Sequence, residues 1–288
     1  MIILENPQLK VTIAEMGAEL TSILDKELTR ACLWTADPAI WGRHAPLLFP
    51  VVGSCRGKEY RYRGQTYAMP QHGFAKEYAF EALKTSESTA VFTLRSDEEK
   101  RIRFPFDWTL TVIYSLAGRE LTVGWKVVND DADSPLFFSI GGHPGFLFDG
   151  PLENQIFEFN SQEDLDRLTL NLQAGLFSRE IDKDYVKGGE PIAVTPHIFD
   201  SDALVFHDFE FTRISLINKN TRHGVIMDLA GFPYVGLWSK PGAPYACIEP
   251  WFGLADYDDF FGEISAKDGI QTLGPGETFE AAYSLEFC

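Results

Sequence analysis

Apolar and polar residues alternate along most of this 288-residue chain, and this two-residue period constrains the fold more than any other feature. The stretch 120–130, ELTVGWKVVND, places Leu121, Val123, Trp125 and Val127 on one side of an extended chain. Successive side chains of a strand point to opposite faces of a sheet, so this pattern predicts a strand with one buried face. The same alternation recurs in WTLTVIYSL, TAVFTLRS, RISLINKN, HGVIMDLAG and YVGLWSK.

Turn signals such as NKNTRHG, SKPGAP and LGPG separate these stretches. Many short strands divided by glycine- and proline-rich turns are typical of antiparallel sandwiches and barrels. Helical patterns are few: PAIWGRHAPLLF, SQEDLDRLTLNL, and a turn or two within WFGLADYDDFFGEIS. No linker or repeat divides the chain, and β-sandwiches of this length often form one domain. We therefore predict an all-β fold, a large antiparallel β-sandwich with few short helices, formed as a single domain by residues 1–288.

The formal net charge of −17 disfavours a nucleic-acid partner and an anionic membrane surface, because both require clustered lysine and arginine. A neutral small molecule is the substrate class that fits best. The N-terminal stretch has no basic segment followed by an apolar core, and no apolar run is long enough to span a membrane. The four cysteines form no CxxC motif. We expect a cytoplasmic protein with reduced thiols.

Two histidines lie beside glycines and aromatic residues: His72 in PQHGFAK and His143 in GGHPGF. Glu249, in YACIEPWFGLAD, follows an apolar strand and is flanked by aromatic residues. Loss of water contact there would raise the pKa of the carboxyl. A buried glutamate paired with an arginine is the structural alternative. The remaining histidines are expected in surface or structural positions; they are His44, His197, His207 and His223.

Two histidines and a glutamate are compatible with a metal site or with general acid–base catalysis. No HxH or HxxxH spacing brings two histidines together for chelation. We therefore expect no metal and no cofactor, and favour proton transfer by the side chains themselves.

The motifs PQHGFAK, GGHPGF, GLWSKPGAPYACIEPWFGLAD and LGPGETF, in this order, resemble the aldose 1-epimerase (galactose mutarotase) family, most of all its bacterial LacX-like branch. The resemblance extends from NPQLKVTIAEMGAELTSI to the last predicted strand. It implies a single large β-sandwich, in agreement with the alternation. It also implies an isomerase that interconverts the α and β anomers of free or phosphorylated aldohexoses without a cofactor.

The resemblance assigns roles to three residues. Glu249 would be the base that takes the proton of the C1 hydroxyl, and His143 would protonate the ring oxygen O5. His72 would donate a hydrogen bond near O5. For these roles Glu249 is expected to be ionised and His143 protonated. The glycines around His143 are expected to let the sugar approach the backbone.

Further positions are expected to bind the sugar. Asp202 would hold a hydroxyl, and Trp238, together with Trp251, would provide an apolar platform.

Two cationic positions depart from the family pattern. LacX-like relatives often carry an arginine where this chain has Ser54; that arginine is either missing here or replaced by Arg56. Lys76 stands where phosphosugar-specific relatives have arginine, and it would bind phosphate only as a point charge.

Other functions remain open from the sequence. The protein could be a hexose-6-phosphate 1-epimerase, or a non-catalytic sugar-binding or sensing protein with the same fold. A metal-dependent sugar isomerase would depend on divalent ions. A glycosidase would need a second catalytic carboxylate facing Glu249, for which Asp202 and Asp228 are the candidates.

Overall fold

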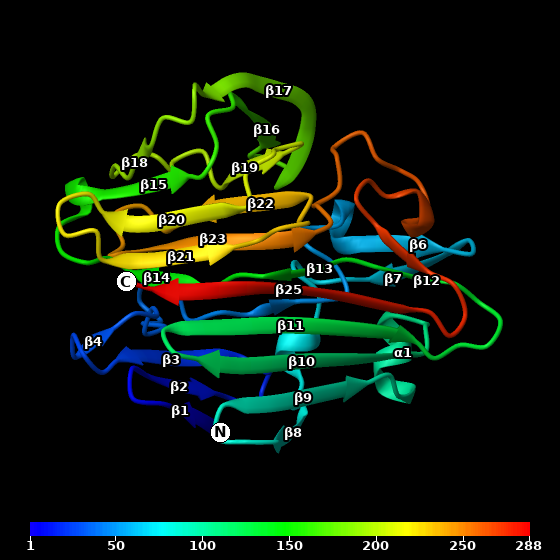
Figure 1. Cartoon of the computed structure of the whole chain (residues 1–288). Helices are drawn as coiled ribbons and strands as arrows, with labels where there is room; N and C mark the ends of the chain where they lie inside the picture. The colour runs from blue at the N-terminus through cyan, green and yellow to red at the C-terminus, as the bar shows by residue number, and fades with distance from the viewer.

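The computed structural model describes residues 1–288 and consists almost entirely of strands (Figure 1). It contains twenty-five strands, β1 to β25, a single six-residue α-helix, α1 (Glu98–Arg103), and four 3₁₀ turns. These turns are η1 (Arg56–Lys58), η2 (Ala75–Glu77), η3 (Leu152–Asn154) and η4 (Ile264–Ala266). The predicted all-β fold with few short helices is confirmed.

The largest sheet has nine antiparallel strands and crosses the whole molecule. In spatial order they are β18 (Ile192–Ala193), β15 (Gln155–Phe159), β20 (Arg213–Asn218), β21 (Gly224–Asp228), β25 (Thr278–Phe287), β11 (Glu120–Asn129), β10 (Trp108–Ala117), β9 (Thr89–Arg95) and β8 (Glu81–Lys84).

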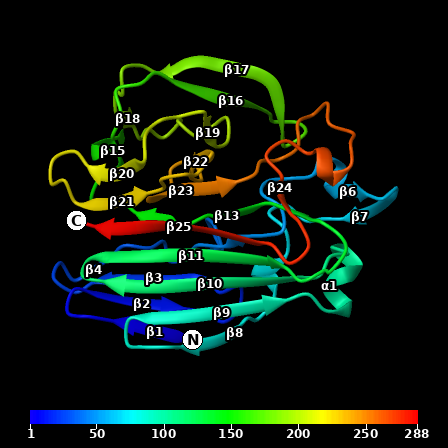
Figure 2. The ribbon, with the colours of Figure 1, turned by 45° about the vertical axis from the view of Figure 1, so that its right-hand side comes forward.

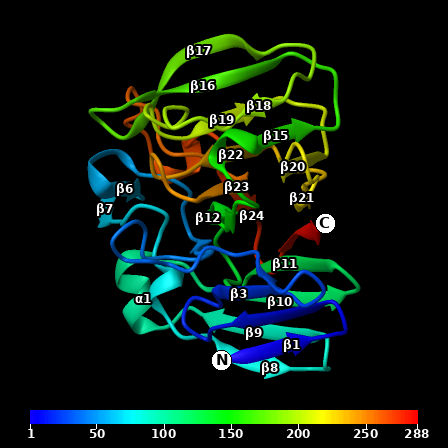
Figure 3. The same ribbon diagram turned by 90° about the vertical axis from the view of Figure 1, so that its left-hand side faces the viewer.

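A second sheet has eight strands and covers one half of the first, as Figures 2 and 3 show from two further directions. Its order is β17 (Leu176–Val186), β16 (Leu165–Asn171), β19 (Leu204–His207), β22 (Tyr234–Trp238), β23 (Tyr245–Phe252), β13 (Ile140–Gly142) and β5 (Leu47–Leu48), with β14 (Gly145–Leu147) also paired to β23.

A four-stranded sheet at the N-terminus lies against the β8–β11 half of the large sheet (Figure 3). It comprises β1 (Ile2–Glu5), β2 (Leu9–Ile13), β3 (Leu20–Asp25) and β4 (Arg30–Ala31). Two ribbons complete the fold: β6 (Glu59–Tyr62) with β7 (Gln65–Ala68), and β12 (Leu136–Phe138) with β24 (Gln271–Leu273).

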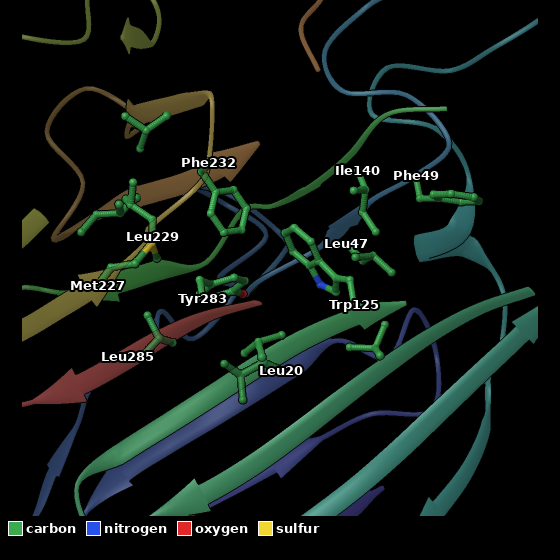
Figure 4. Packing of buried hydrophobic residues seen from close by; sticks show 14 of the residues in the cluster. Leu20, Leu47, Phe49, Trp125, Ile140, Met227, Leu229, Phe232, Tyr283 and Leu285 are labelled. Atoms are coloured by element: carbon green, nitrogen blue, oxygen red, sulfur yellow. The ribbon is translucent and has the colours of Figure 1, made fainter. Parts of the chain in front are cut away.

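The alternating pattern predicts burial correctly in the large sheet. Along β11 every second residue is buried, and Leu121, Val123, Trp125 and Val127 are all inside. These side chains belong to one cluster of 61 buried residues that also includes residues of β2, β3 and β23. In Figure 4 the ring of Trp125 lies close to Tyr283, with centroids 5.5 Å apart. The layers are therefore held together by one continuous apolar core.

Two predicted helices are wrong. Within residues 161–172 the chain forms β16 (Leu165–Asn171) instead, because Leu165 and Leu168 turn into the core and the strand pairs with β17 and β19. Residues 38–49 form turns and the short strand β5. Helix α1 was not predicted; Asp97 caps it by accepting a hydrogen bond from the backbone N–H of Lys100 at 2.9 Å.

Strand β23 lies in the middle of the eight-stranded sheet and is buried along nearly its whole length. Both of its faces are covered, so its polar residues are removed from bulk water. All four cysteines are unpaired. The one α-helix, α1, has six residues, and none of the helical segments could span a membrane.

Candidate active site

The pairing of β23 with β13 and β14 places His143 opposite Glu249. Gly141 pairs with Trp251, and Gly145 pairs with Cys247, so a single register runs across the gap between β13 and β14. His143 lies in that gap. Its Nε2 is 3.3 Å from Oε2 of Glu249, which confirms that the sheet brings these two predicted residues together.

Burial controls the ionisation of this pair, since Glu249 is 2% and His143 8% exposed. Burial raises the pKa of Glu249 well above its ordinary value, and the Asp202 carboxylate adds to the effect, whereas Trp251 opposes it. Burial lowers the pKa of His143 well below its ordinary value, and its neighbours His72 and Lys76 lower it further. The neutral form of each group is therefore favoured, in contrast to the charged pair expected from the sequence.

His72 is held as a neutral hydrogen-bond donor. Its Nδ1 accepts a hydrogen bond from the backbone N–H of Gly53 at 3.1 Å, so the ring proton lies on Nε2. Burial, reinforced by Lys76, lowers the pKa of His72 to about 3. The rings of His72 and His143 are edge to face, with centroids 5.6 Å apart.

The backbone around His72 takes the left-handed conformation, with φ of 62° at His72 and 64° at Gly73. A Cβ atom at Gly73 would lie 2.2 Å from the carbonyl oxygen of Phe49. Only glycine fits at that position. The close approach of the two segments brings His72 to its place beside His143.

The three residues lie at a cavity of about 510 Å³. Its polar wall is formed by Gln71, Asp202, Ser54 and three cationic residues, and its apolar wall by aromatic and aliphatic side chains. The cationic residues are Arg43, Lys76 and Lys240, and the tryptophans are Trp41, Trp238 and Trp251. An apolar pocket with few convergent polar groups is typical of small-molecule sites.

Four of the predicted binding residues line this cavity: Asp202, Lys76, Trp238 and Trp251. Asp202 stands in a left-handed turn before β19, with φ of 68°. Trp238 ends β22 and meets the edge of the His143 ring, with centroids 5.5 Å apart. The ammonium of Lys76 donates to the carbonyl oxygens of Gln71, at 3.0 Å, and of Gly73. Burial lowers the pKa of Lys76 to about 8.

Arg56 does not line the cavity, which contradicts the expectation that it replaces the family arginine. Its guanidinium donates to the carbonyl oxygen of Asp258 and lies over the ring of Phe261, 4.3 Å from the centroid. These contacts direct it into a second cavity, of about 690 Å³. Ser54 does line the main cavity, and Arg43 provides the only arginine there.

Sequence reasoning missed Trp41, Arg43 and Lys240. Trp41 lies against His143, with ring centroids 4.8 Å apart, and also meets the edge of Trp238 at 5.5 Å. Trp41 and Arg43 belong to an irregular connection, where periodicity carries no information about direction. Lys240 could have been found, because it follows Trp238 in the motif GLWSKPGAP.

The glycines around His143 serve protein packing. A Cβ atom at Gly141 would lie 2.6 Å from the Trp251 ring, and one at Gly145 would lie 3.1 Å from the Tyr245 ring. Neither glycine lines the cavity. These two glycines leave space for the rings of Trp251 and Tyr245, and the approach of a sugar to the backbone here stays a prediction.

The fold also gathers three potential metal ligands that are distant in sequence. Donor atoms of His143, Cys247 and Glu249 all lie within 4.8 Å of one another. The spacing argument against chelation considered histidine pairs alone and did not anticipate this group.

The site has the parts needed for proton transfer to and from a small polar molecule: a carboxyl, an imidazole beside it and a neutral imidazole donor. Together with the layered antiparallel sheets, it defines a β-sandwich protein of the galactose mutarotase type. The chain belongs to the aldose 1-epimerase family, whose model matches residues 1–286.

Relatives agree with this assignment over the full chain. The plasmid-encoded and chromosomal LacX proteins of Lactococcus lactis subsp. lactis are each 26% identical over 98% of this chain and 97% of their own length. A galactose mutarotase related enzyme from Lactobacillus acidophilus is 32% identical, with a TM-score of 0.93, and the match covers 100% of this chain and 97% of that one. A galactose mutarotase-like protein from Lactobacillus casei is 30% identical, with a TM-score of 0.94 and full coverage of both chains.

Proposed function

We propose that the protein is an aldose 1-epimerase, an isomerase that interconverts the α and β anomers of an aldohexose by metal-free general acid–base catalysis. The observation that carries the proposal is the 3.3 Å approach of His143 Nε2 to Glu249 Oε2 at the cavity. A carboxyl and an imidazole so close can take and give a proton within one bound molecule.

In the proposed reaction the Glu249 carboxylate takes the proton of the C1 hydroxyl while His143 gives a proton to O5. The C1–O5 bond breaks and leaves an open-chain aldehyde. Rotation about C1–C2 presents the other face of the carbonyl, and O5 attacks C1 as both proton transfers reverse. No net proton, electron or water is consumed.

The unoccupied hydrogen-bonding capacity of the pair supports these roles. Oε2 of Glu249 is buried and has no hydrogen-bond partner in the protein, so a sugar hydroxyl can satisfy it. Because burial favours the neutral form of both groups, the titratable proton of the pair lies mainly on Glu249. Sugar binding must therefore move that proton to His143 before O5 can be protonated. His72, with its proton on Nε2, is the neutral donor proposed to stabilise developing charge at O5.

Other lining residues are proposed to position the sugar. The indoles of Trp41 and Trp238 offer apolar surfaces for the C–H face of a pyranose. Asp202 is suited to accept hydrogen bonds from sugar hydroxyls, although one of its oxygens already accepts from the N–H of Ala203 at 2.9 Å.

A second candidate is a hexose-6-phosphate 1-epimerase. Three cations line the cavity, Arg43, Lys76 and Lys240, although the chain as a whole carries a net charge of −17. A cationic wall in an acidic protein favours an anionic group on the substrate. Of these three residues only Arg43 carries a guanidinium group, which can donate two parallel hydrogen bonds to a phosphate.

The test is anomer exchange, followed by polarimetry and NMR, on a panel of free and 6-phosphorylated aldoses. We expect acceleration over spontaneous mutarotation, and the same rate after treatment with EDTA. Loss of activity on chelation, restored by a divalent ion, would favour a metal-dependent isomerase. A protein that binds sugars without accelerating exchange would be a sensor and would contradict the proposal.

A further inference from the structure

Strand β23 presents a second reactive side chain next to Glu249. Residues two apart on a strand point to the same face, so Cys247 and Glu249 lie side by side. His143 faces Glu249 in the register described above, and Gly145 faces Cys247. A thiol, a carboxyl and an imidazole therefore converge, with all donor atoms within 4.8 Å of one another.

This set of donors suits Zn²⁺. Zinc takes thiolate, imidazole and carboxylate ligands at about 2.0–2.3 Å in tetrahedral geometry. Ligand atoms around such an ion are then separated by roughly 3.3–3.8 Å, by tetrahedral geometry. His143 Nε2 and Glu249 Oε2 already lie 3.3 Å apart. All three donor atoms lie within 4.8 Å of one another, so binding an ion would draw the more distant donors closer together.

The burial of the donors provides an independent reason to expect a ligand. Cys247 is fully buried, and Glu249 is 2% exposed. The Glu249 Oε2 atom points toward His143 but has no hydrogen-bond partner in the protein. Buried polar atoms without partners are uncommon in folded proteins. His143 and Glu249 also line the main cavity, which leaves room for a fourth ligand such as water.

We propose that Zn²⁺ binds to His143, Cys247 and Glu249 and thereby inhibits the protein. The ion would occupy the proposed acid and base together, so it would exclude the sugar from the position between them. Binding releases the thiol proton and any proton shared by the other two groups, and no redox step is involved. The metal site itself stands without the proposed epimerase activity; only the inhibition rests on it.

Metal binding is tested directly by titrating the apo-protein with Zn²⁺ in a calorimeter and with Co²⁺ in a spectrophotometer. We expect one equivalent to bind, and the Co²⁺ complex to show a near-ultraviolet thiolate-to-metal charge-transfer band. Cys247→Ser should abolish that band and weaken Zn²⁺ binding at least about tenfold, since a thiolate ligand is lost. Cys32→Ser, at another buried cysteine, is the matched control and should bind as the wild type does.

Inhibition by Zn²⁺ is tested by measuring anomer exchange with the same variants. Zn²⁺ should inhibit anomer exchange by the wild type and by Cys32→Ser, and EDTA should reverse the inhibition. Cys247→Ser should retain exchange without metal and resist Zn²⁺. If the serine variant folds poorly, Cys247→Ala replaces it, because the thiol packs among Trp34, Ala243 and Tyr245.

Unchanged Zn²⁺ affinity in the Cys247 variants, or a Co²⁺ complex without the thiolate band, would overturn the metal site. An inactive wild type that still gives the band would contradict the proposed function and leave the metal site supported. Equal inhibition of Cys247→Ser and wild type would show that Zn²⁺ acts elsewhere.

Discussion

Oε2 of Glu249 lies 3.3 Å from Nε2 of His143 and has no hydrogen-bond partner in the protein. Strand β23 provides the glutamate, and the gap between β13 and β14 provides the histidine, so the contact depends on one β-sheet register. The pair is buried, and burial favours the neutral form of both groups. These properties lead to most of the predictions below.

Glu249→Gln tests the proposed base. The amide keeps the size of the side chain and its hydrogen-bonding capacity but cannot take a proton. We expect anomer exchange to fall by roughly 10²–10⁴-fold, while sugar affinity changes little. Polarimetry for the rate and calorimetry for binding distinguish the two effects. Exchange close to the wild-type rate would exclude Glu249 as the base.

His143→Asn provides the partner variant. This variant should also reduce the rate of anomer exchange. In the double variant Glu249→Gln/His143→Asn, the activation free energy should rise by less than the sum of the two single increases. Groups that act in one concerted event are not independent, which is why their effects do not add. Strict additivity would indicate that the two residues act in separate steps.

The dependence of kcat/KM on pH should be bell-shaped. Burial raises the pKa of Glu249 and lowers that of His143, so the pair holds one proton over the range between them. Acidification adds a second proton, mainly to His143, and blocks the base. Alkaline conditions remove the shared proton, mainly from Glu249, and abolish the acid. Both apparent pKa values belong to the pair. A rate independent of pH from about 4 to 10, after subtraction of spontaneous exchange, would contradict this assignment.

Glu249→Gln should also stabilise the folded protein at neutral pH. The carboxyl has an ordinary pKa of 4.5, and burial raises it in the folded state. Between these two pKa values the Glu249 carboxyl is ionised only in the unfolded state. The free energy of unfolding of the wild type therefore falls as pH rises from the lower pKa to the higher one. Below pH 4.5 both states hold the proton and the advantage of the variant disappears. We expect a gain of about 1 kcal/mol, or a rise in Tm of roughly 2–4 °C, at pH 7. Thermal unfolding at pH 4 and pH 7 measures it; equal Tm differences at both pH values would contradict the linkage.

Substitutions of Arg43 and Arg56, which line different cavities, test whether the substrate carries a phosphate. If the substrate carries a phosphate, Arg43→Gln should raise KM for a 6-phosphorylated aldose by roughly 10–100-fold, because a charge-assisted hydrogen bond is lost. Arg56→Gln removes the same charge from the second cavity and should leave KM unchanged. Equal effects of the two variants would show that net charge, not a contact in the main cavity, determines the preference.

The chain is expected to unfold as one unit. The continuous cluster of 61 buried residues joins strands from the N-terminal sheet to the C-terminal strand β25. Calorimetry and circular dichroism should therefore report a single transition with coincident midpoints. Two separated transitions would show that residues 1–288 contain more than one domain.

The fold class could be predicted from the sequence alone, because strand alternation is a local property. Every second residue of β11 is buried as the pattern predicts. Sequence motifs also identified His72, His143 and Glu249 as candidates. Local patterns failed where pairing partners decide the conformation: residues 161–172 have an ambiguous apolar spacing, and β17 and β19 make them a strand.

The surroundings of the candidate residues depend on long-range packing and could not be predicted from the sequence. Arg56 is directed away from the main cavity by Asp258 and Phe261, and Trp41 is directed toward His143; neither contact can be derived from the adjacent sequence. The ionisation of Glu249 and His143 likewise depends on desolvation by strands distant in the chain. The approach of Cys247 to His143 has the same origin. Hydrophobic periodicity is set by neighbours along the chain, whereas distance, burial and charge at a site are set by neighbours in space.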